Sequence, residues 1–335
     1  MAVFYVDAAA DGEGDGSSWA EAFDEAQFEI DLEGCDAGDI YYMKAGTYTL
    51  DSAYNSSARA GTAVAPVSII GVKAATTNAP PVIADWGSGA DRPVFTCAAN
   101  TMLFGAYYKL FNLTATGTGA DYFKTGNLCV VYNCKIEQQH SSSRTGLVTG
   151  TNCLILLTDA SATYGGTPTG IACNIGAYSY IAFCYLHDSV TIMSLGGDAI
   201  SIEHNIVDTA TTGIYVAARY TPTIVNNTFY NCTTAISAST SYLSRCINNI
   251  IDNCTDAFVW TTQTDINFFA YNHQGNNVTR MYDTATNKVA STLPHTDAWA
   301  TTPADPKFTT AGSDFSLASD SPCIDAGMTI TLGVG

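Results

Sequence analysis

A repeat of 22 residues constrains the fold of this chain more than any other feature. Three segments superimpose at this interval, namely Ile202–Asp208, Ile224–Tyr230 and Cys246–Asp252. The alignment stacks three asparagines and two cysteines: Asn205, Asn227, Asn249, Cys232 and Cys254. Weaker copies of the same element occur earlier, at Ile181–Asp188 and Val131–Ile136.

A period of about 20 to 25 residues, built from short β-branched runs without a helix, is typical of one turn of a parallel β-helix. Each turn then holds three short strands and three bends. Leucine-rich repeats share the period, but their leucine pattern is missing here. The sequence therefore predicts an all-β, three-sheet solenoid with about 22 residues per coil. About twelve coils between residues 40 and 300 would form a rod ~55 Å long.

The aligned asparagines have two alternative roles. Stacked coils would place Asn205, Asn227 and Asn249 in an internal ladder ~4.8 Å apart, with their amides bonded along the stack. Alternatively, they only occupy left-handed turn conformations, which asparagine tolerates well. Both roles are structural.

The N-terminal segment predicts an amphipathic helix that closes the first coil. Ser18 and Glu21 have the spacing of a capping box, and Gly34 supplies a stop. An apolar stripe runs along this segment, formed by Trp19, Phe23, Ala26 and Ile30. We expect three regions: a strand and cap helix over 1–38, the β-helix over 39–300, and a closing segment over 301–335.

Charge and composition argue against several partners. The net charge is −18, and twelve acidic residues precede the first basic residue, Lys44. Since the thirteen Lys and Arg residues are scattered, we expect no nucleic-acid partner. No apolar run reaches the ~18 residues that a membrane-spanning helix needs, so no membrane partner is expected. Without a recognisable signal peptide, the chain is expected to be made in the cytoplasm, and its eleven cysteines to be reduced and mostly buried.

Both ends of the chain resemble a recurrent family of right-handed, pectate-lyase-like β-helix proteins found in phage virions and on bacterial surfaces. The entry segment carries Tyr5-Val6-Asp7, Asp15-Gly16-Ser17-Ser18-Trp19 and Ala45-Gly46-Thr47-Tyr48. The closing segment carries Asp305-Pro306-Lys307-Phe308 and Ser321-Pro322-Cys323-Ile324-Asp325-Ala326-Gly327. The resemblance implies a right-handed helix over essentially the whole chain. It does not specify function, because the family includes lyases, hydrolases, adhesins and virion proteins.

Catalytic motifs are sparse. The polygalacturonase motifs have no match, and only two glutamates, Glu137 and Glu203, follow residue 33. The best cluster comprises Asp188, Asp198, Glu203, His204 and Asp208, with Arg219 or Arg245 one or two coils on. Its weak catalytic candidates are Glu203, Asp208 and Arg219, and the alternative is that they are ordinary turn and surface residues.

One turn has the beginning of a calcium loop. Asp11, Glu13 and Asp15 place oxygen ligands at positions one, three and five, and Gly16 follows. Ala22 stands where the bidentate glutamate is expected, so a flexible acidic turn is the favoured interpretation. We expect no cofactor, with calcium at this turn as the alternative.

Three classes of function are compatible with these features. The favoured class is a non-enzymatic structural or adhesive protein, specifically a phage virion component such as a capsid decoration, head fibre or tail-associated protein. Its partners would be capsid or tail proteins at a virion surface, and a homotrimer is conceivable. The alternatives are a polysaccharide lyase or glycoside hydrolase, and a carbohydrate-binding module that stacks sugars on tyrosines. The candidate tyrosines are Tyr107, Tyr108, Tyr178, Tyr180, Tyr215 and Tyr220.

Overall fold

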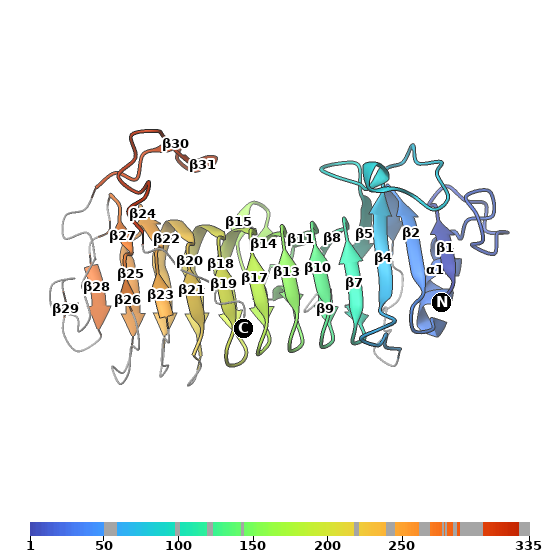
Figure 1. The fold of residues 1–335 in the computed structure, drawn as a ribbon, viewed down its shortest axis with the longest axis horizontal. Helices are drawn as coiled ribbons and strands as arrows, with labels where there is room; N and C mark the ends of the chain where they lie inside the picture. Colours follow the sequence, from blue (N-terminus) through green and yellow to red (C-terminus); the bar gives the residue numbers. More distant parts are fainter. Residues whose placement is uncertain are drawn as a thin grey trace.

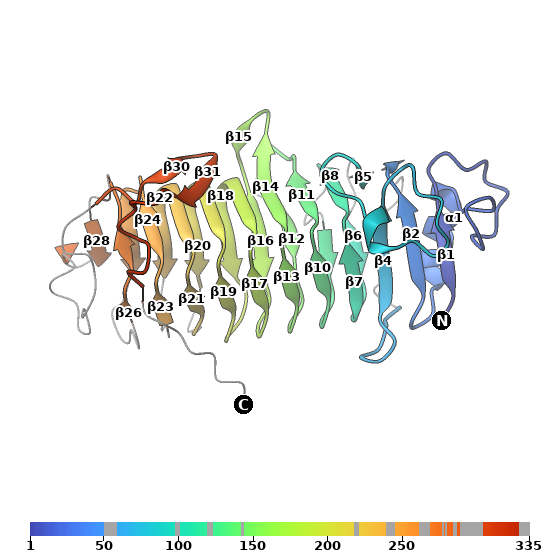
Figure 2. The ribbon, with the colours of Figure 1, turned by 45° about the horizontal axis from the view of Figure 1, so that its top comes forward.

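The chain winds into a rod of stacked coils, and successive coils add parallel strands to the same faces (Figures 1 and 2). This computed structural model describes residues 1–49, 59–97, 101–118, 123–141, 144–217, 221–238, 245–260, 269–276, 278, 280–283, 287–288 and 304–327. The predicted all-β parallel solenoid is confirmed.

One face of the rod is an eleven-stranded parallel sheet that receives one strand from each coil. Its strands are β1 (Val3–Val6), β2 (Ile40–Lys44), β4 (Val67–Val72), β7 (Tyr108–Phe111), β10 (Val130–Tyr132), β13 (Leu154–Leu156), β17 (Tyr180–Ala182), β19 (Ser201–Glu203), β21 (Thr223–Val225), β23 (Arg245–Ile247) and β26 (Phe269–Ala270). Paired residues from β7 to β23 recur at intervals of 21 to 26 residues. The longest interval separates β13 from β17, where a hairpin is inserted.

The other two faces form one bent, eighteen-stranded sheet. The face that follows the eleven-stranded sheet along each coil holds β3 (Gly46–Thr49), β5 (Pro93–Cys97), β8 (Thr114–Gly117), β11 (Lys135–Gln138), β14 (Asp159–Tyr164), β24 (Ile250–Asp252) and β27 (His273–Gln274). The third face holds β6 (Met102–Phe104), β9 (Phe123–Thr125), β12 (Thr145–Val148), β16 (Ile171–Ile175), β25 (Asp256–Trp260) and β28 (Arg280–Asp283). Three long strands bend through the corner and join both faces: β18 (Tyr185–Leu195), β20 (Ile206–Val216) and β22 (Thr228–Ala238).

Two antiparallel strands extend this sheet as hairpins, β15 (Thr167–Pro168) beside β14 and β29 (Asn287–Lys288) beside β28. One 3-10 turn, η1 (Ile83–Asp85), lies in the connection between β4 and β5.

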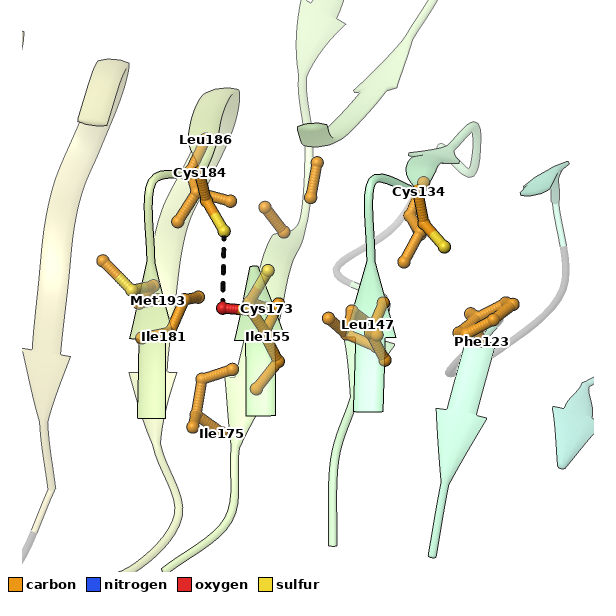
Figure 3. Close-up of a cluster of buried hydrophobic side chains, with 14 of the residues drawn as sticks. Phe123, Cys134, Leu147, Ile155, Cys173, Ile175, Ile181, Cys184, Leu186 and Met193 are labelled. Atoms are coloured by element: carbon orange, nitrogen blue, oxygen red, sulfur yellow. Dashed lines mark hydrogen bonds between the residues drawn. The ribbon is translucent and has the colours of Figure 1, made fainter. Parts of the chain in front are cut away.

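The core is a continuous apolar column inside the coils. Alternate strand residues point inward, so that Val131, Ile155, Ile181, Ile202 and Ile224 lie in register and are fully buried. Figure 3 shows part of this interior, where Cys184 Sγ bonds to the carbonyl oxygen of Ile155 at 3.9 Å. Burial of β-branched side chains along a parallel stack is the main source of its stability.

The coils turn at corners where one residue adopts a left-handed backbone. The corner between the eleven-stranded sheet and the second face uses eight such residues: Asn112, Asn133, Leu157, Phe183, His204, Asn226, Asn248 and Tyr271. The bend inside the long strands uses Asp188, Thr209 and Asn231, and Asn253 takes the equivalent position between β24 and β25. Asparagine is common at these positions because its short side chain tolerates positive φ.

The N-terminal end is closed by one short helix, although the predicted start and buried face of this helix are wrong. Helix α1 spans Glu25–Gly34 and is capped by Asp24 and Gln27, whose side chains each accept the other's backbone N–H at 2.8 and 3.1 Å. Ser18 cannot begin the helix because Phe23 pairs with Val6 as a strand extension, with its N–H bonded to the Tyr5 carbonyl.

The helix buries Phe28 and Leu32, whereas Phe23 of the predicted stripe is buried from the strand extension that precedes the helix. Ala26 and Ile30 are exposed, Ile30 by 75%. Phe28 packs on Tyr41 and Phe95, with ring centroids 5.6 and 6.3 Å apart, and so closes the core at this end. Trp19 lies on the surface, edge-on to Tyr5.

The described part of the closing segment folds back along the rod. Its hairpin, β30 (Phe308–Thr310) and β31 (Asp314–Leu317), packs on Tyr230 of β22, where the ring centroids of Tyr230 and Phe315 are 5.4 Å apart. Among the helices within the described ranges, none has the length and apolar character needed to traverse a bilayer.

Candidate functional site

A linked set of polar side chains lies on the outer side of the second face. Inward positions of β14, β18 and β20 are filled by Ala160, Leu186 and Val207, so the residues on either side of each point outward. The β14–β15 hairpin and the β30–β31 hairpin stand on the same side of the rod, with β18 between them along its axis (Figure 2). We call the outward residues Asp159, Tyr185, His187, Asp188 and Asp208 the outer-face cluster.

His187 is held between two carboxylates. Its Nε2 lies 2.9 Å from Asp159 Oδ1, in the preceding coil, and its Nδ1 lies 2.7 Å from Asp188 Oδ2. Burial alone would lower the pKa of the imidazole, but the bonds to both carboxylates outweigh it and raise the pKa. The ring also stacks on Tyr185 at 4.4 Å. His187 is therefore fixed in position and favoured in its cationic form.

Asp208 lies directly beside His187 in the next coil. Its Oδ2 accepts a hydrogen bond from the Tyr185 hydroxyl at 3.1 Å, and its Oδ1 accepts one from Thr209 at 2.9 Å. The residue is only 5% exposed. Burial raises its pKa although both hydrogen bonds act to lower it, so this carboxyl holds its proton more tightly than an ordinary aspartate.

Further ionisable residues continue this face in both directions. Lys135 and Glu137 form an ion pair at 2.9 Å in the coil before Asp159. Asp252, two coils after Asp208, is buried, and its Oδ1 has no hydrogen-bond partner among the described residues. Burial raises the pKa of Asp252 as well. Lys135 and His187 are thus already paired with carboxylates, and Arg92, directly before β5, donates to the Asn133 side-chain oxygen at 2.8 Å.

The structure separates the predicted cluster. Glu203 lies on the eleven-stranded sheet, where Ser201 and Tyr180 donate hydrogen bonds to its carboxylate at 2.6 and 3.2 Å. Asp198 lies at another corner, bonded to Thr221, and His204 stacks on Phe183. Of the predicted residues, only Asp188 and Asp208 are in the outer-face cluster.

Of the two predicted arginines, the structure describes one. Arg219 is outside the described residues. Arg245 begins β23 on the eleven-stranded sheet, away from the second face.

The stacked asparagines form a buried ladder along the corner. Asn227 Oδ1 accepts from the backbone N–H and side-chain amide of Asn205 at 2.9 and 3.0 Å, and Asn249 Oδ1 does the same for Asn227 at 2.9 and 3.1 Å. Asn272 extends the ladder by one coil. The left-handed conformation belongs to the preceding residue, such as Asn226 or Asn248.

The thiols of the stacked cysteines contact backbone carbonyl groups at the corners. Cys232 Sγ lies 3.4 Å from the Tyr230 carbonyl oxygen, and Cys254 Sγ lies 3.3 Å from that of Asp252. Of the ten cysteines whose side chains are described, nine are buried, and all ten are free thiols. Burial in contact with backbone carbonyls indicates a structural role.

The acidic N-terminal turn is closed by its own backbone. Asp11 Oδ1 accepts from the Glu13 N–H at 3.2 Å, and Asp15 Oδ1 accepts from the Ser17 N–H at 2.9 Å. Gln27 donates to the carbonyl oxygens of Gly12 and Gly14 from helix α1. Across the described residues, no group of three or more His, Cys, Asp or Glu side chains is arranged to hold a metal ion.

The sequence analysis missed Asp159, Tyr185 and the role of His187. A signal was present, because Asn133-Cys134, Leu157-Thr158 and Phe183-Cys184 occupy equivalent corner positions. Alignment on these pairs would have placed Asp159 beside Tyr185. The inserted β14–β15 hairpin lengthens the interval between paired residues of β13 and β17 to 26 residues, and this hid the register.

Comparisons with known proteins agree with this geometry. The family model described as the right handed beta helix region matches residues 118–276. The chain has a right-handed β-helix fold. No curated protein matches the chain in sequence.

Solved structures show the same fold at low identity. The pectate lyase Pel9A superimposes with a TM-score of 0.58 and 13% identity, over 99% of this chain and 92% of the lyase. A rhamnogalacturonan lyase superimposes with a TM-score of 0.50 and 14% identity, over 77% of this chain and 74% of that chain. At such identities the likeness concerns the fold alone.

Proposed function

We propose that the protein is an enzyme that cleaves the glycosidic bonds of a polysaccharide at the outer-face cluster. The observation that carries the proposal is the bond between Tyr185 and the buried Asp208, whose raised pKa suits a proton donor. The similarity of the fold to that of a pectate lyase and a rhamnogalacturonan lyase supports this class of function. The alternative role as a lyase or hydrolase is thereby favoured over the structural role.

The cluster supplies both groups that glycosidic cleavage needs. Asp208 would protonate the leaving glycosidic oxygen as the general acid. Asp159, with a side chain 37% exposed and one oxygen fixed by His187, would act as the base. In hydrolysis the base takes a proton from the attacking water, and in elimination it takes one from the carbon beside a uronate carboxylate.

Charge favours hydrolysis of an uncharged polymer. Glu137, Asp159, Asp188 and Asp208 line this face, whereas Lys135 and His187 are paired with carboxylates and the Arg92 guanidinium donates to Asn133. A polyuronate would be repelled unless a cation neutralised it. We therefore expect a neutral polysaccharide as substrate.

The test is incubation of the purified protein with a panel of neutral and acidic polysaccharides. New reducing ends without unsaturated products would indicate hydrolysis, and unsaturated products would indicate elimination. Asp208→Asn is expected to lower turnover by about 10²- to 10⁴-fold, the usual contribution of general acid catalysis. Asp252→Asn is the matched control, since Asp252 is equally buried on the same face but lies away from His187.

Turnover is also expected to fall as the pH rises through the raised pKa of Asp208, because only the protonated carboxyl can act as the acid. Absence of products across the panel, or full activity of Asp208→Asn, would contradict the proposal.

The second candidate is the structural or adhesive role, with a phage virion component as its concrete form. It is supported by the saturation of the outer-face cluster, in which His187, Tyr185 and Thr209 already occupy carboxylate oxygens. The buried asparagine ladder would suit a rod whose function is rigidity. Failure of the whole panel together with decoration of native particles by the protein would favour this candidate.

A further inference from the structure

The corner before the second face departs from asparagine in three consecutive coils. Asn112 and Asn133 precede these coils, and Asn226 and Asn248 follow them, all with φ between 52° and 57°. The three intervening residues are Leu157, Phe183 and His204, with φ of 51°, 56° and 56°.

The residues that stand in place of asparagine at these three corners are unfavourable for folding. A left-handed backbone is costly for a bulky side chain, and asparagine meets the same requirement at lower cost in the neighbouring coils. Solvent exposure adds to the cost, since Leu157 is 48% and Phe183 is 54% exposed. Strain and exposed apolar surface at the same residues are characteristic of functional positions.

The three residues lie beside the outer-face cluster. Two residues after Leu157 the chain reaches Asp159, and two residues after Phe183 it reaches Tyr185. In coils with an asparagine corner, the equivalent outward positions are Thr114, Lys135, Thr228 and Ile250. The three corners without asparagine therefore lie in the coils that carry the outer-face cluster. The last described corner, Tyr271, is a separate exception in a coil whose His273 contacts Ala304 of the closing segment at 2.8 Å.

The three corner residues lie in adjacent coils, and the side chains of two of them are stacked. Backbone bonds link the coils at these positions, from Leu157 N–H to Ala182 and from Phe183 N–H to Glu203, both at 3.3 Å. The rings of Phe183 and His204 stack 5.0 Å apart with an interplanar angle of 18°. Asn226 approaches the far side of His204, with Nδ2 3.1 Å from Nε2.

We propose that Leu157, Phe183 and His204 form a sugar-binding platform that receives a pyranose ring of a neutral polysaccharide next to the outer-face cluster. The C–H face of the sugar would pack on the exposed Phe183 ring, and its hydroxyl groups would donate to the neighbouring carboxylates. This assignment rests on the proposed function, because it places the substrate of that same site along the corner.

The test measures binding rather than cleavage. Phe183→Asn is made in the Asp208→Asn background, so that the polymer stays intact, and the probes are soluble mixed-linkage β-glucan, galactomannan and polygalacturonate. Phe183→Asn introduces the residue that the equivalent corners Asn112, Asn133, Asn226 and Asn248 use, so its thermal unfolding midpoint is expected to equal or exceed that of the parent. Loss of binding then does not reflect loss of folding.

The matched control is Tyr178→Asn. Tyr178 lies in the same coil, is 62% exposed and has a φ of 57°, but it occupies the corner at the other end of β17. We expect Phe183→Asn to raise the dissociation constant for a neutral polymer about tenfold or more, and Tyr178→Asn to leave it within about twofold.

The platform is refuted if Phe183→Asn binds the neutral polymers as tightly as its parent, if none of the probes binds the parent, or if polygalacturonate binds as well as they do. Its failure is separable from failure of the proposed function. If the unmodified protein cleaves a polymer but Phe183→Asn does not weaken binding, only the platform is overturned. If Phe183→Asn weakens binding but the unmodified protein cleaves nothing, only the enzymatic role is overturned.

Discussion

Asn249 Oδ1 accepts two hydrogen bonds from Asn227, one from the backbone N–H at 2.9 Å and one from the side-chain amide at 3.1 Å. The Oδ1 of each ladder asparagine thus accepts a hydrogen bond from a buried backbone N–H of the preceding coil. Its own side-chain amide donates to the asparagine of the next coil. Buried polar groups that lose such partners destabilise a fold strongly.

Asn227→Ala is expected to lower the free energy of unfolding by about 3 kcal/mol or more, because it leaves the Asn205 N–H and the Ile202 carbonyl without their partner. Denaturant unfolding measures the loss. Asn226→Gly is the control, since glycine tolerates the φ of 57° at that corner, and a change within about 0.5 kcal/mol is expected. Equal effects of the two changes would contradict the ladder.

His187 should make stability depend on pH. Its folded pKa is raised by Asp159 and Asp188, so the stabilisation is complete below the ordinary value of about 6.5 and is lost as the pH rises through the folded pKa. The difference in unfolding free energy between the protein and His187→Gln should therefore be largest near pH 5 and shrink at alkaline pH. A difference that stays constant between pH 5 and alkaline pH would contradict this expectation.

The cap helix offers a test of which face is buried. Phe28→Ala should cost about 3–5 kcal/mol, because the ring is 2% exposed and packs on Tyr41 and Phe95. Ile30→Ala, two residues away in the same helix, should change stability by less than about 0.5 kcal/mol. Denaturant midpoints distinguish the two, and a larger effect at Ile30 would indicate that the other face of the helix is buried.

The closing hairpin is held on the rod through aromatic contacts. Phe315 lies edge-on to Tyr230 at 5.4 Å and to Phe308 at 5.3 Å. Phe315→Ser should therefore release the hairpin and speed proteolytic cleavage within residues 304–327, while the coils stay protected. Limited proteolysis with mass analysis checks this expectation. Ser313→Ala, an exposed change in the same hairpin, should leave the cleavage rate as it is.

The period, the parallel stack and the positions that repeat within it could be predicted from the order of residues alone. These follow from local chemistry, because β-branched runs favour strands and asparagine favours the ladder and corner positions. The recurrence of Asn205, Asn227 and Asn249 at a constant interval was sufficient to place them in adjacent coils. The distinction between the buried Asn227 and the left-handed Asn226 depended on which way the corner turns.

The start of the helix and the place of the outer-face cluster depend on contacts between residues that are distant in the chain. The capping spacing of Ser18 was overridden because Phe23 bonds to the first strand, a pairing that local propensity does not contain. His187 meets Asp159 across 28 residues, since an inserted hairpin lengthens that coil without changing the strand register. Stacking brings such residues together whatever length of chain separates them, and a fixed repeat interval cannot anticipate this.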